Sequence, residues 1–276
     1  MKQILGGMVV AAALSGSAFA ADLATRLPMK AAPMMADPSY NWSGLYIGVT
    51  AGAAWTKDSV GLNAEASSYF VGDTNPSDAS AFGALGSRDF KQSTGIFGGK
   101  AGYNWQAASW VVGLEGDFSS LRFRQSATIT GNPHAGFDDG SSIFKDQVSA
   151  DWLATVRGRV GYAYDRLLFY GTAGVAFAHS NLQSSIRDFA PHARGFGTAL
   201  VSASPIKVGW AAGAGIDYAV ANNWIVSVEY LHADLGKVNA AGLIKDEDPL
   251  TAETAAVAYS AKLTSDIVRA GIGYKF

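Results

Sequence analysis

A strict alternation of apolar and polar residues runs through the segment 95–118 and constrains the fold of this chain more than any other feature. On the first half of the segment one side carries Phe97, Tyr103 and Trp105, whereas the other side carries glycine, lysine and asparagine. The alternation resumes after a short connection, Gln106–Ser109. A period of two on both sides of such a connection predicts a β-hairpin with one apolar face.

Six further segments repeat this alternation, so eight strands are predicted in all. Only 16% of the 276 residues are charged and 32 residues are glycine, and there are no helices to cover an apolar sheet face. An apolar exterior around a small polar interior is typical of transmembrane β-barrels. We therefore predict an all-β fold, an eight-stranded antiparallel transmembrane β-barrel. The six segments are approximately 44–55, 151–162, 167–179, 207–220, 224–235 and 264–276.

The connections between the predicted strands alternate between short and long. In bacterial outer-membrane barrels the short turns face the periplasm and the long loops face the outside, and we expect the same orientation here. The short connections are Gln106–Ser109, Ala163–Arg166 and Ala221–Asn223. The long, polar connections cover roughly 56–92, 124–150, 180–206 and 236–263.

The outward-facing aromatic residues fall into two groups. Two aromatic belts separated by small and aliphatic residues match the two interfaces of a membrane. The belt beside the short turns comprises Tyr103, Trp105, Trp110, Tyr162, Phe169, Tyr218, Trp224, Tyr274 and Phe276. The belt beside the long connections comprises Trp55, Phe118, Trp152, Phe177, Trp210 and Tyr230.

The N-terminal 20 residues have the three parts of a secretory signal peptide. Lys2 provides a positive charge, Ile4–Leu14 an apolar stretch, and Ala18-Phe19-Ala20 a cleavage site before Ala21. The apolar stretch is about 11 residues long, which is too short for a helix that spans a membrane. Export across the inner membrane is therefore expected.

The remaining chain divides into a linker and a barrel. Residues 21–40 contain three prolines and no periodicity, which predicts a flexible N-terminal linker. The predicted outer-membrane β-barrel domain then covers residues 41–276.

Five charged residues point inward by parity and lie five positions from an aromatic residue of the belt beside the short turns. Five residues along a strand tilted by ~45° rise about 12 Å, near the middle of a ~25 Å apolar band. Paired charges are tolerable in an interior where lone charges are costly, so we predict an ion network that fills the lumen; the alternative is a scatter of charges in a polar lumen. We expect Lys100 and Glu115 to face each other across the hairpin. The five residues are Lys100, Glu115, Arg157, Glu229 and Arg269.

Enzyme and cofactor sites are not indicated. The chain has no Gly-x-Ser-x-Gly element, cysteine is absent, and the net charge of −2 does not favour nucleic acid as a partner. The segment Gly95–Ala101 differs from a phosphate-binding loop in its spacing, and no Ser or Thr follows its lysine. We therefore predict no enzyme activity and no catalytic, cofactor-binding or metal-binding residues.

Histidines and acidic segments near the long connections leave two further interpretations open. The histidines could gather to bind a metal ion or haem, although their separations give no chelating spacing and surface positions are favoured. The acidic segments Asp138-Asp139 and Asp246-Glu247-Asp248 could recruit divalent cations that bridge to lipopolysaccharide, although their spacing matches no calcium loop. The histidines are His134, His179, His192 and His232.

Several segments resemble the small outer-membrane barrels of alphaproteobacteria, a porin family of OmpA-like barrels that includes outer membrane immunogenic proteins. They are NWSGLYIGVTAGAAW (41–55), GGKAGYNWQ and WVVGLEGDF (within 98–118), GRVGYAYDRLLFYGTAGVAFA (158–178), GWAAGAGIDYAVANNWIVSVEYLHADLG (209–236) and RAGIGYKF (269–276). The resemblance implies an eight-stranded barrel in the bacterial outer membrane, surrounded by lipid and lipopolysaccharide. It also implies periplasmic chaperones and the barrel assembly machinery as partners, with Tyr274 and Phe276 in the terminal recognition signal.

The favoured function at this point is a structural one, in which a surface barrel supports the integrity of the envelope and presents antigenic loops. A narrow porin for small solutes is one alternative and requires an open lumen. A loop-mediated adhesin, or a receptor for a host or surface ligand such as haem or a metal, is the other alternative.

The terminal signal leads to a direct test of assembly. Deleting Phe276 should lower the amount of heat-modifiable, folded protein in outer membranes, because the residue belongs to the terminal recognition strand. Semi-denaturing gel electrophoresis of membrane fractions measures the folded form. Assembly of the truncated chain at wild-type yield would show that Phe276 has no targeting role.

Overall fold

The computed structural model describes residues 40–70, 76–133, 141–189, 196–247 and 253–276. The predicted signal peptide, its cleavage site at Ala20 and Ala21, and linker residues 21–39 lie outside the described residues. The described elements are β1 (Gly44–Ala64), η1 (Ser68–Phe70), α1 (Pro76–Gly86), β2 (Arg88–Ala107), β3 (Trp110–Gly131), β4 (Ser141–Tyr164), β5 (Leu167–Phe189), β6 (Phe196–Ala203), β7 (Ile206–Ala219), β8 (Trp224–Asp246) and β9 (Thr254–Lys275).

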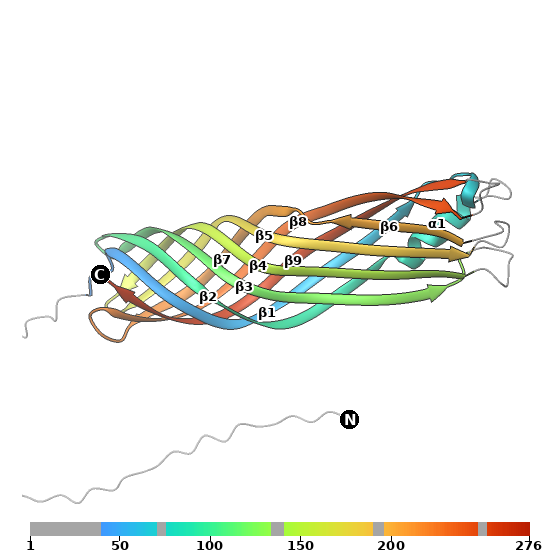
Figure 1. Ribbon diagram of the computed structural model, residues 1–276. Coiled ribbons are helices and arrows are strands. Elements are labelled where there is room, and N and C mark those ends of the chain that lie inside the picture. The colour runs from blue at the N-terminus through green and yellow to red at the C-terminus, as the bar shows by residue number, and fades with distance from the viewer. Residues whose placement is uncertain (1–39, 71–75, 134–140, 190–195, 248–252) are drawn as a thin grey trace, which may run out of the picture. The chain divides into compact units, whose positions relative to one another are not determined.

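The strands close into an antiparallel ring, as the alternation predicts (Figure 1). Each of β1 to β5 pairs with its neighbours in sequence, β8 pairs with β9, and β9 returns to pair with β1. The short segments β6 and β7 both pair with β5 and with β8, so together they occupy one position in the ring. The ring in the described residues is therefore eight strands wide. No helix among these residues is long and apolar enough to cross a membrane.

The four predicted long connections are shorter than expected, because strand structure extends into each of them from both ends. The connection placed at 124–150 is strand as far as Gly131 and again from Ser141 onward. The reason is that the sense of the alternation reverses along the long strands. In β1 the outward residues change from Ile47 and Val49 to Lys57 and Ser59, while the inward residues become apolar. Beyond the membrane the outside of the ring faces water, so polar residues stand where apolar ones stood before.

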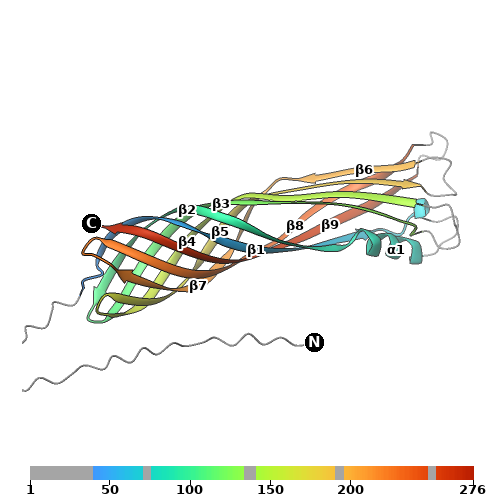
Figure 2. The ribbon, with the colours of Figure 1, turned by 90° about the horizontal axis from the view of Figure 1, so that it is seen from below.

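The outer half of the barrel encloses a hydrophobic core. Helix α1 lies near the strand ends in both views and contributes Phe82, which is fully buried (Figures 1 and 2). The ring of Phe82 packs 4.9 Å from Phe144 of β4 and 5.0 Å from Phe70 of η1, measured between ring centroids. Burial of such rings is the main stabilising contribution available outside the membrane. The core fills the interior at this end.

Irregularities in strand pairing occur near the boundary between the two halves. The register shifts between Ser120 and Phe123 on β3, between Ala150 and Leu153 on β4, and between Asp234 and Lys237 on β8. The break between β6 and β7 falls at residues 204–205. Bulges bend and twist strands, so they let the wall change course where its interior changes from polar to apolar.

The other end of the barrel is closed by tight turns and by the residues before β1. The turns at Ala108 and Asp165 have φ angles of 53° and 51°, the left-handed conformation that two-residue hairpin connections need. Trp42 is fully buried, and its indole nitrogen donates a hydrogen bond of 3.3 Å to the carbonyl of Asp165. Tyr40 packs beside Trp42, and its hydroxyl donates a hydrogen bond to the Asn222 carbonyl.

The outward aromatic residues lie on the lipid-facing surface in the predicted phase. Trp110 of β3 stands opposite Tyr162 of β4, and Trp224 of β8 stands opposite Tyr274 of β9. These pairs belong to the belt beside the short turns. On the other belt Phe118 and Trp152 stack with their ring centroids 5.7 Å apart. Large apolar side chains that remain about half exposed over this zone are expected only where the surroundings are lipid.

The extended strands predict slow hydrogen exchange in a region that a loop would leave open. Residues 182–188 of β5 pair with β4 on one side and with β6 on the other. Their amides should therefore be protected from exchange as strongly as those of residues 168–176, which can be followed by mass spectrometry of the folded barrel. Complete exchange of 182–188 within seconds would contradict the strand assignment.

Candidate functional site

Eight charged side chains gather in the lumen of the membrane-spanning half, and we call them the lumen network. Four carry positive charge and four carry negative charge, so the set is electrically balanced. Each is buried, with at most 7% of its surface exposed. They come from six strands, because every second side chain of a strand points into the lumen. The members are Lys100, Glu115, Asp117, Arg157, Arg159, Asp217, Glu229 and Arg269.

Arg157 on β4 is the centre of the lumen network. One terminal nitrogen, Nη2, lies 2.6 Å from Glu115 and 2.9 Å from Asp117, both on β3. The other, Nη1, lies 2.5 Å from Glu229 on β8. It also donates to the Thr172 hydroxyl, at 2.9 Å. A single guanidinium thus bridges three carboxylates across the barrel, which uses the fixed fork of donors that arginine provides.

Arg269 on β9 completes the bridge from the other side. Its Nη2 and Nε lie 2.7 and 2.8 Å from one oxygen of Glu229, which is its direct partner in the strand register. Its Nη1 lies 2.9 Å from Asp117. Asp117 also accepts a hydrogen bond from Thr155. Every carboxylate oxygen of Glu229 and Asp117 therefore has a donor, which is the condition for burying such charges.

Lys100 on β2 reaches Glu115 along the diagonal of the strand pairing. The register sets Lys100 opposite Asp117, whereas Glu115 stands opposite Gly102, so Lys100 and Glu115 are diagonal rather than direct neighbours across the hairpin. The Lys100 amine still lies 3.6 Å from Glu115 on the diagonal. It also donates to the hydroxyl of Ser227, at 3.3 Å.

A second group lies beside the first and contains Arg159. Its Nη2 lies 2.7 Å from Asp217 on β7, and its Nη1 donates to the Tyr46 hydroxyl at 2.9 Å. The guanidinium also stacks 3.8 Å from the ring centroid of Tyr170. The Tyr46 hydroxyl in turn donates to Glu115 at 2.8 Å, so it connects the two groups.

Inward glycines make room for these tyrosines. A Cβ atom on Gly102 would overlap the Tyr46 hydroxyl, and a Cβ on Gly215 would contact the Tyr170 hydroxyl at 2.5 Å. The abundance of glycine in the strands therefore reflects close approach of large inward side chains in a narrow lumen. The same residues exclude open space beside the network.

The structure brings the five charges proposed from the sequence into one connected set. It adds Asp117, Arg159 and Asp217, which the sequence interpretation leaves out. The alternation in the sequence shows that these three side chains point inward. Counting five residues from the aromatic belt, however, finds only residues at one height along the barrel axis. Neighbouring strands are staggered in a barrel, and long side chains reach between levels, so a count along single strands cannot find all members.

The charged side chains of the lumen network are buried and held by one another. Among the described residues no three His, Cys, Asp or Glu side chains are grouped as a metal site. His179 lies 3.3 Å from Asp151, and His232 lies 2.7 Å from Asp266, each a simple pair on the outer surface. His134, His192 and Asp138-Asp139 lie outside the described residues.

One buried carboxyl outside the membrane-spanning half has a perturbed pKa. Asp58 on β1 lies beyond the belt residue Trp55 and is only 1% exposed. Burial, together with the smaller effect of the neighbouring Asp89 charge, raises its pKa to about 7. Its carboxyl is therefore largely protonated below pH 7, which limits the cost of placing it beside the outer core.

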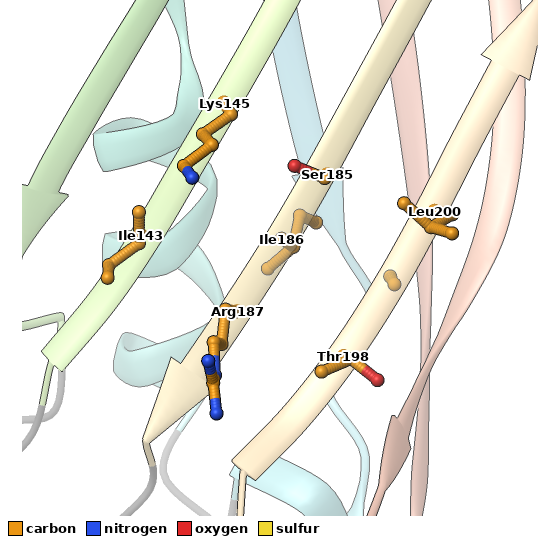
Figure 3. Close-up of a pocket in the computed structure, with 8 residues that line it drawn as sticks. Ile143, Lys145, Ser185, Ile186, Arg187, Thr198 and Leu200 are labelled. Atoms are coloured by element: carbon orange, nitrogen blue, oxygen red, sulfur yellow. The ribbon is translucent and has the colours of Figure 1, made fainter.

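The outer surface carries a separate pocket of about 520 Å³ between β4, β5 and β6. Lys145 and Ile143 of β4 line one side, and Leu200 of β6 lines the other. Figure 3 shows Arg187 of β5 between them, on the same outer face. The pocket combines two cations with exposed apolar groups and has no contact with the lumen network.

A family model and a curated relative show the family of this chain. Residues 8–276 match the family model described as outer membrane protein beta-barrel domain. The 31 kDa outer-membrane immunogenic protein of Brucella melitensis is 34% identical over 97% of both chains. The 25 kDa outer-membrane immunogenic protein of Brucella abortus is 28% identical over the full length of both. The crystal structure of OprG from Pseudomonas aeruginosa is 18% identical, with a TM-score of 0.41, over 86% of this chain and 98% of that one.

A double-mutant cycle on the Arg159–Asp217 pair tests how the lumen charges depend on one another. Asp217→Leu should destabilise the barrel by about 3–5 kcal/mol, because it leaves a buried cation without its main partner. Arg159→Met should also destabilise it, and the double variant should regain part of the loss. Urea unfolding in lipid vesicles measures each value. Simple additivity of the two losses would show that the side chains do not interact.

Proposed function

The chain belongs to the family of outer membrane protein β-barrel domains, and from this premise we propose that it is a closed structural barrel of the bacterial outer membrane. Its role is to support the envelope and to present its outer half at the cell surface. The relatives are outer-membrane proteins called immunogenic, which fits a surface that is accessible from outside. Lipid and lipopolysaccharide are its surroundings.

The observation that carries the proposal is the filled lumen. The contacts of Arg157 and Arg269 connect strands on opposite sides of the ring, so the side chains cross the space that a channel would need. Trp42 lies below this level and the outer hydrophobic core lies above it. An eight-stranded ring is only wide enough for its own side chains, so three successive layers of filling favour a closed barrel over a narrow porin.

The same features favour a protein without enzyme activity. The carboxylates of the lumen network are held by cations in the interior, and the two described histidines pair with exposed or half-exposed aspartates on the outer surface. A nucleophile, base and orienting group on one accessible face are not among the described contacts. The balance of charge within the lumen network supports a role in barrel stability rather than in surface chemistry.

Assembly partners follow from the position of the C-terminal residues. Tyr274 and Phe276 lie on the belt beside the short turns, with their ring centroids 5.1 Å apart. Phe276 is 64% exposed and makes its backbone hydrogen bond to Leu45 of β1, where the ring closes. Exposure of this kind supports recognition of the last strand by the barrel assembly machinery, after delivery by periplasmic chaperones.

A second candidate function rests on the outer pocket. Lys145 and Arg187 beside Leu200, which is 86% exposed, could hold an anionic ligand with an apolar part. This feature keeps a surface receptor or adhesin as the alternative to a purely structural role. It does not depend on an open lumen.

Conductance in a planar bilayer tests the closed barrel. The wild-type protein should show no steady conductance comparable to that of general porins, because the lumen network occupies the cross-section. The outward variant Lys245→Gln is a matched control and should behave identically, since Lys245 is exposed near the end of β8. A steady porin-like conductance of the wild type would overturn the proposal in favour of the narrow porin.

A further inference from the structure

Four exposed cations gather on the outer surface of three adjacent strands, and we call them the basic cluster. Lys57 lies on β1, Lys91 on β2, and Arg122 and Arg124 on β3. All four point outward and are exposed. None takes part in the lumen network, and the proposed structural role makes no use of them.

Two of these cations repel each other in the folded barrel. Lys57 and Lys91 are direct partners in the strand register, with both side chains on the outward face. Like charges directly opposite on a sheet are destabilising. The nearby acidic residues are Asp89, exposed on β2, Asp151 on β4, which lies 3.3 Å from His179, and Asp266 on β9, whose carboxylate already accepts hydrogen bonds from Tyr230 and His232. The cluster therefore has an excess of positive charge.

The strands of the cluster also separate here. Pairing between β2 and β3 runs from the turn only as far as Ile96 opposite Leu121. Beyond that level only β2 side chains bridge the two strands: Thr94 donates to the carbonyl of Arg122 at 3.3 Å, and Gln92 accepts from the backbone nitrogen of Arg124 at 3.3 Å. The arginines thus stand along a strand edge whose backbone groups are not fully used by a neighbour.

The level of the cluster matches the headgroups of the outer leaflet. Lys57 follows the belt residue Trp55 by two positions, whereas Arg122 and Arg124 follow the belt residue Phe118 by four and six. At ~2.3 Å of rise per residue on a tilted strand, these positions lie about 5, 9 and 14 Å beyond the belt. A headgroup layer is roughly 5–8 Å thick, so Lys57 lies within it, Arg122 lies at its outer edge and Arg124 lies above it. Arg122 also covers the ring of Phe97 at 5.5 Å, at the edge of the apolar zone.

From these observations we infer that the basic cluster is a binding site for the phosphate groups of the lipopolysaccharide that surrounds the barrel. Arginine pairs with phosphate through two parallel hydrogen bonds, and lysine contributes compact charge. A bound phosphate also removes the repulsion between Lys57 and Lys91. The site deepens the proposed envelope role and rests on it, because it anchors the barrel to the lipid of the outer leaflet.

Binding of purified lipid A to the full chain folded in neutral detergent micelles tests the site. Replacing the whole cluster by glutamine should weaken binding of diphosphorylated lipid A at least about tenfold, equivalent to about 1.4 kcal/mol. Lys91→Gln alone should weaken it measurably, whereas the matched control Lys245→Gln should leave it unchanged. Dephosphorylated lipid A should bind the wild type and the fourfold variant equally weakly. The fourfold variant combines Lys57→Gln, Lys91→Gln, Arg122→Gln and Arg124→Gln.

Three results would overturn the inference. The first is equal affinity of the wild type and the fourfold variant for diphosphorylated lipid A. The second is equal binding of the phosphorylated and dephosphorylated lipids by the wild type. The third is full competition by inorganic phosphate at millimolar concentration, which would indicate a general anion site in place of a lipid site.

Folding and function are controlled separately. Heat-modifiable migration on gels identifies the folded form of each variant. If the fourfold variant does not fold, two double variants replace it: Lys57→Gln with Lys91→Gln, and Arg122→Gln with Arg124→Gln. Each double variant is expected to lose part of the affinity for diphosphorylated lipid A. Lower stability of these variants in detergent without lipid A would assign the cations a role in the fold and overturn the site. The conductance measurement concerns only the lumen, so a failed binding test leaves the closed barrel intact.

Discussion

The structure depends on one constraint, which is that a ring of eight strands in lipid has a lumen too narrow for bulk water and too polar to be left empty. Because lipid surrounds the ring, apolar side chains point outward. Side chains alternate between the two faces of a strand, so the residues between them point into the lumen. The inward residues of this chain include charges, and charges in such a space must be paired. The bridging contacts of Arg157 and Arg269 meet that requirement across the barrel.

Parity along the strands was the part of the fold that the sequence could predict. It identified the ring, both aromatic belts and five lumen charges, since each depends only on the alternation of neighbouring residues. The outer half was missed because its alternation has the opposite sense, with residues such as Lys57 outward and Val60 inward. The register at Lys100 was missed by two residues, because it depends on the two-residue turn at Ala108: Asp117 stands opposite Lys100, and Glu115 lies on the diagonal. Trp42 gave no periodic signal at all.

Each long strand therefore passes through two environments, the lipid bilayer and the water outside it. In the half beside the short turns the lipid is outside and the charges are inside, and in the other half water is outside and a hydrophobic core is inside. The pairing irregularities on β3, β4 and β8 lie near the change of environment. Separation of β2 from β3 occurs beyond Ile96, and the basic cluster borders it. Wall geometry, interior composition and surface charge thus change together near the outer leaflet.

The distribution of the lumen network over the chain also bears on the order of events during insertion. Its members stand on β2, β3, β4, β7, β8 and β9, and Asp117 on β3 obtains one of its two guanidinium partners only from Arg269 on the last strand. Strands that entered the hydrocarbon one at a time would carry single charges without partners, at a cost of several kcal/mol for each ion. The low-energy route is one in which the whole sequence has been delivered before any strand crosses, and the ring enters the bilayer as a unit. The need to pair the lumen charges thus favours complete synthesis of the chain before it enters the membrane.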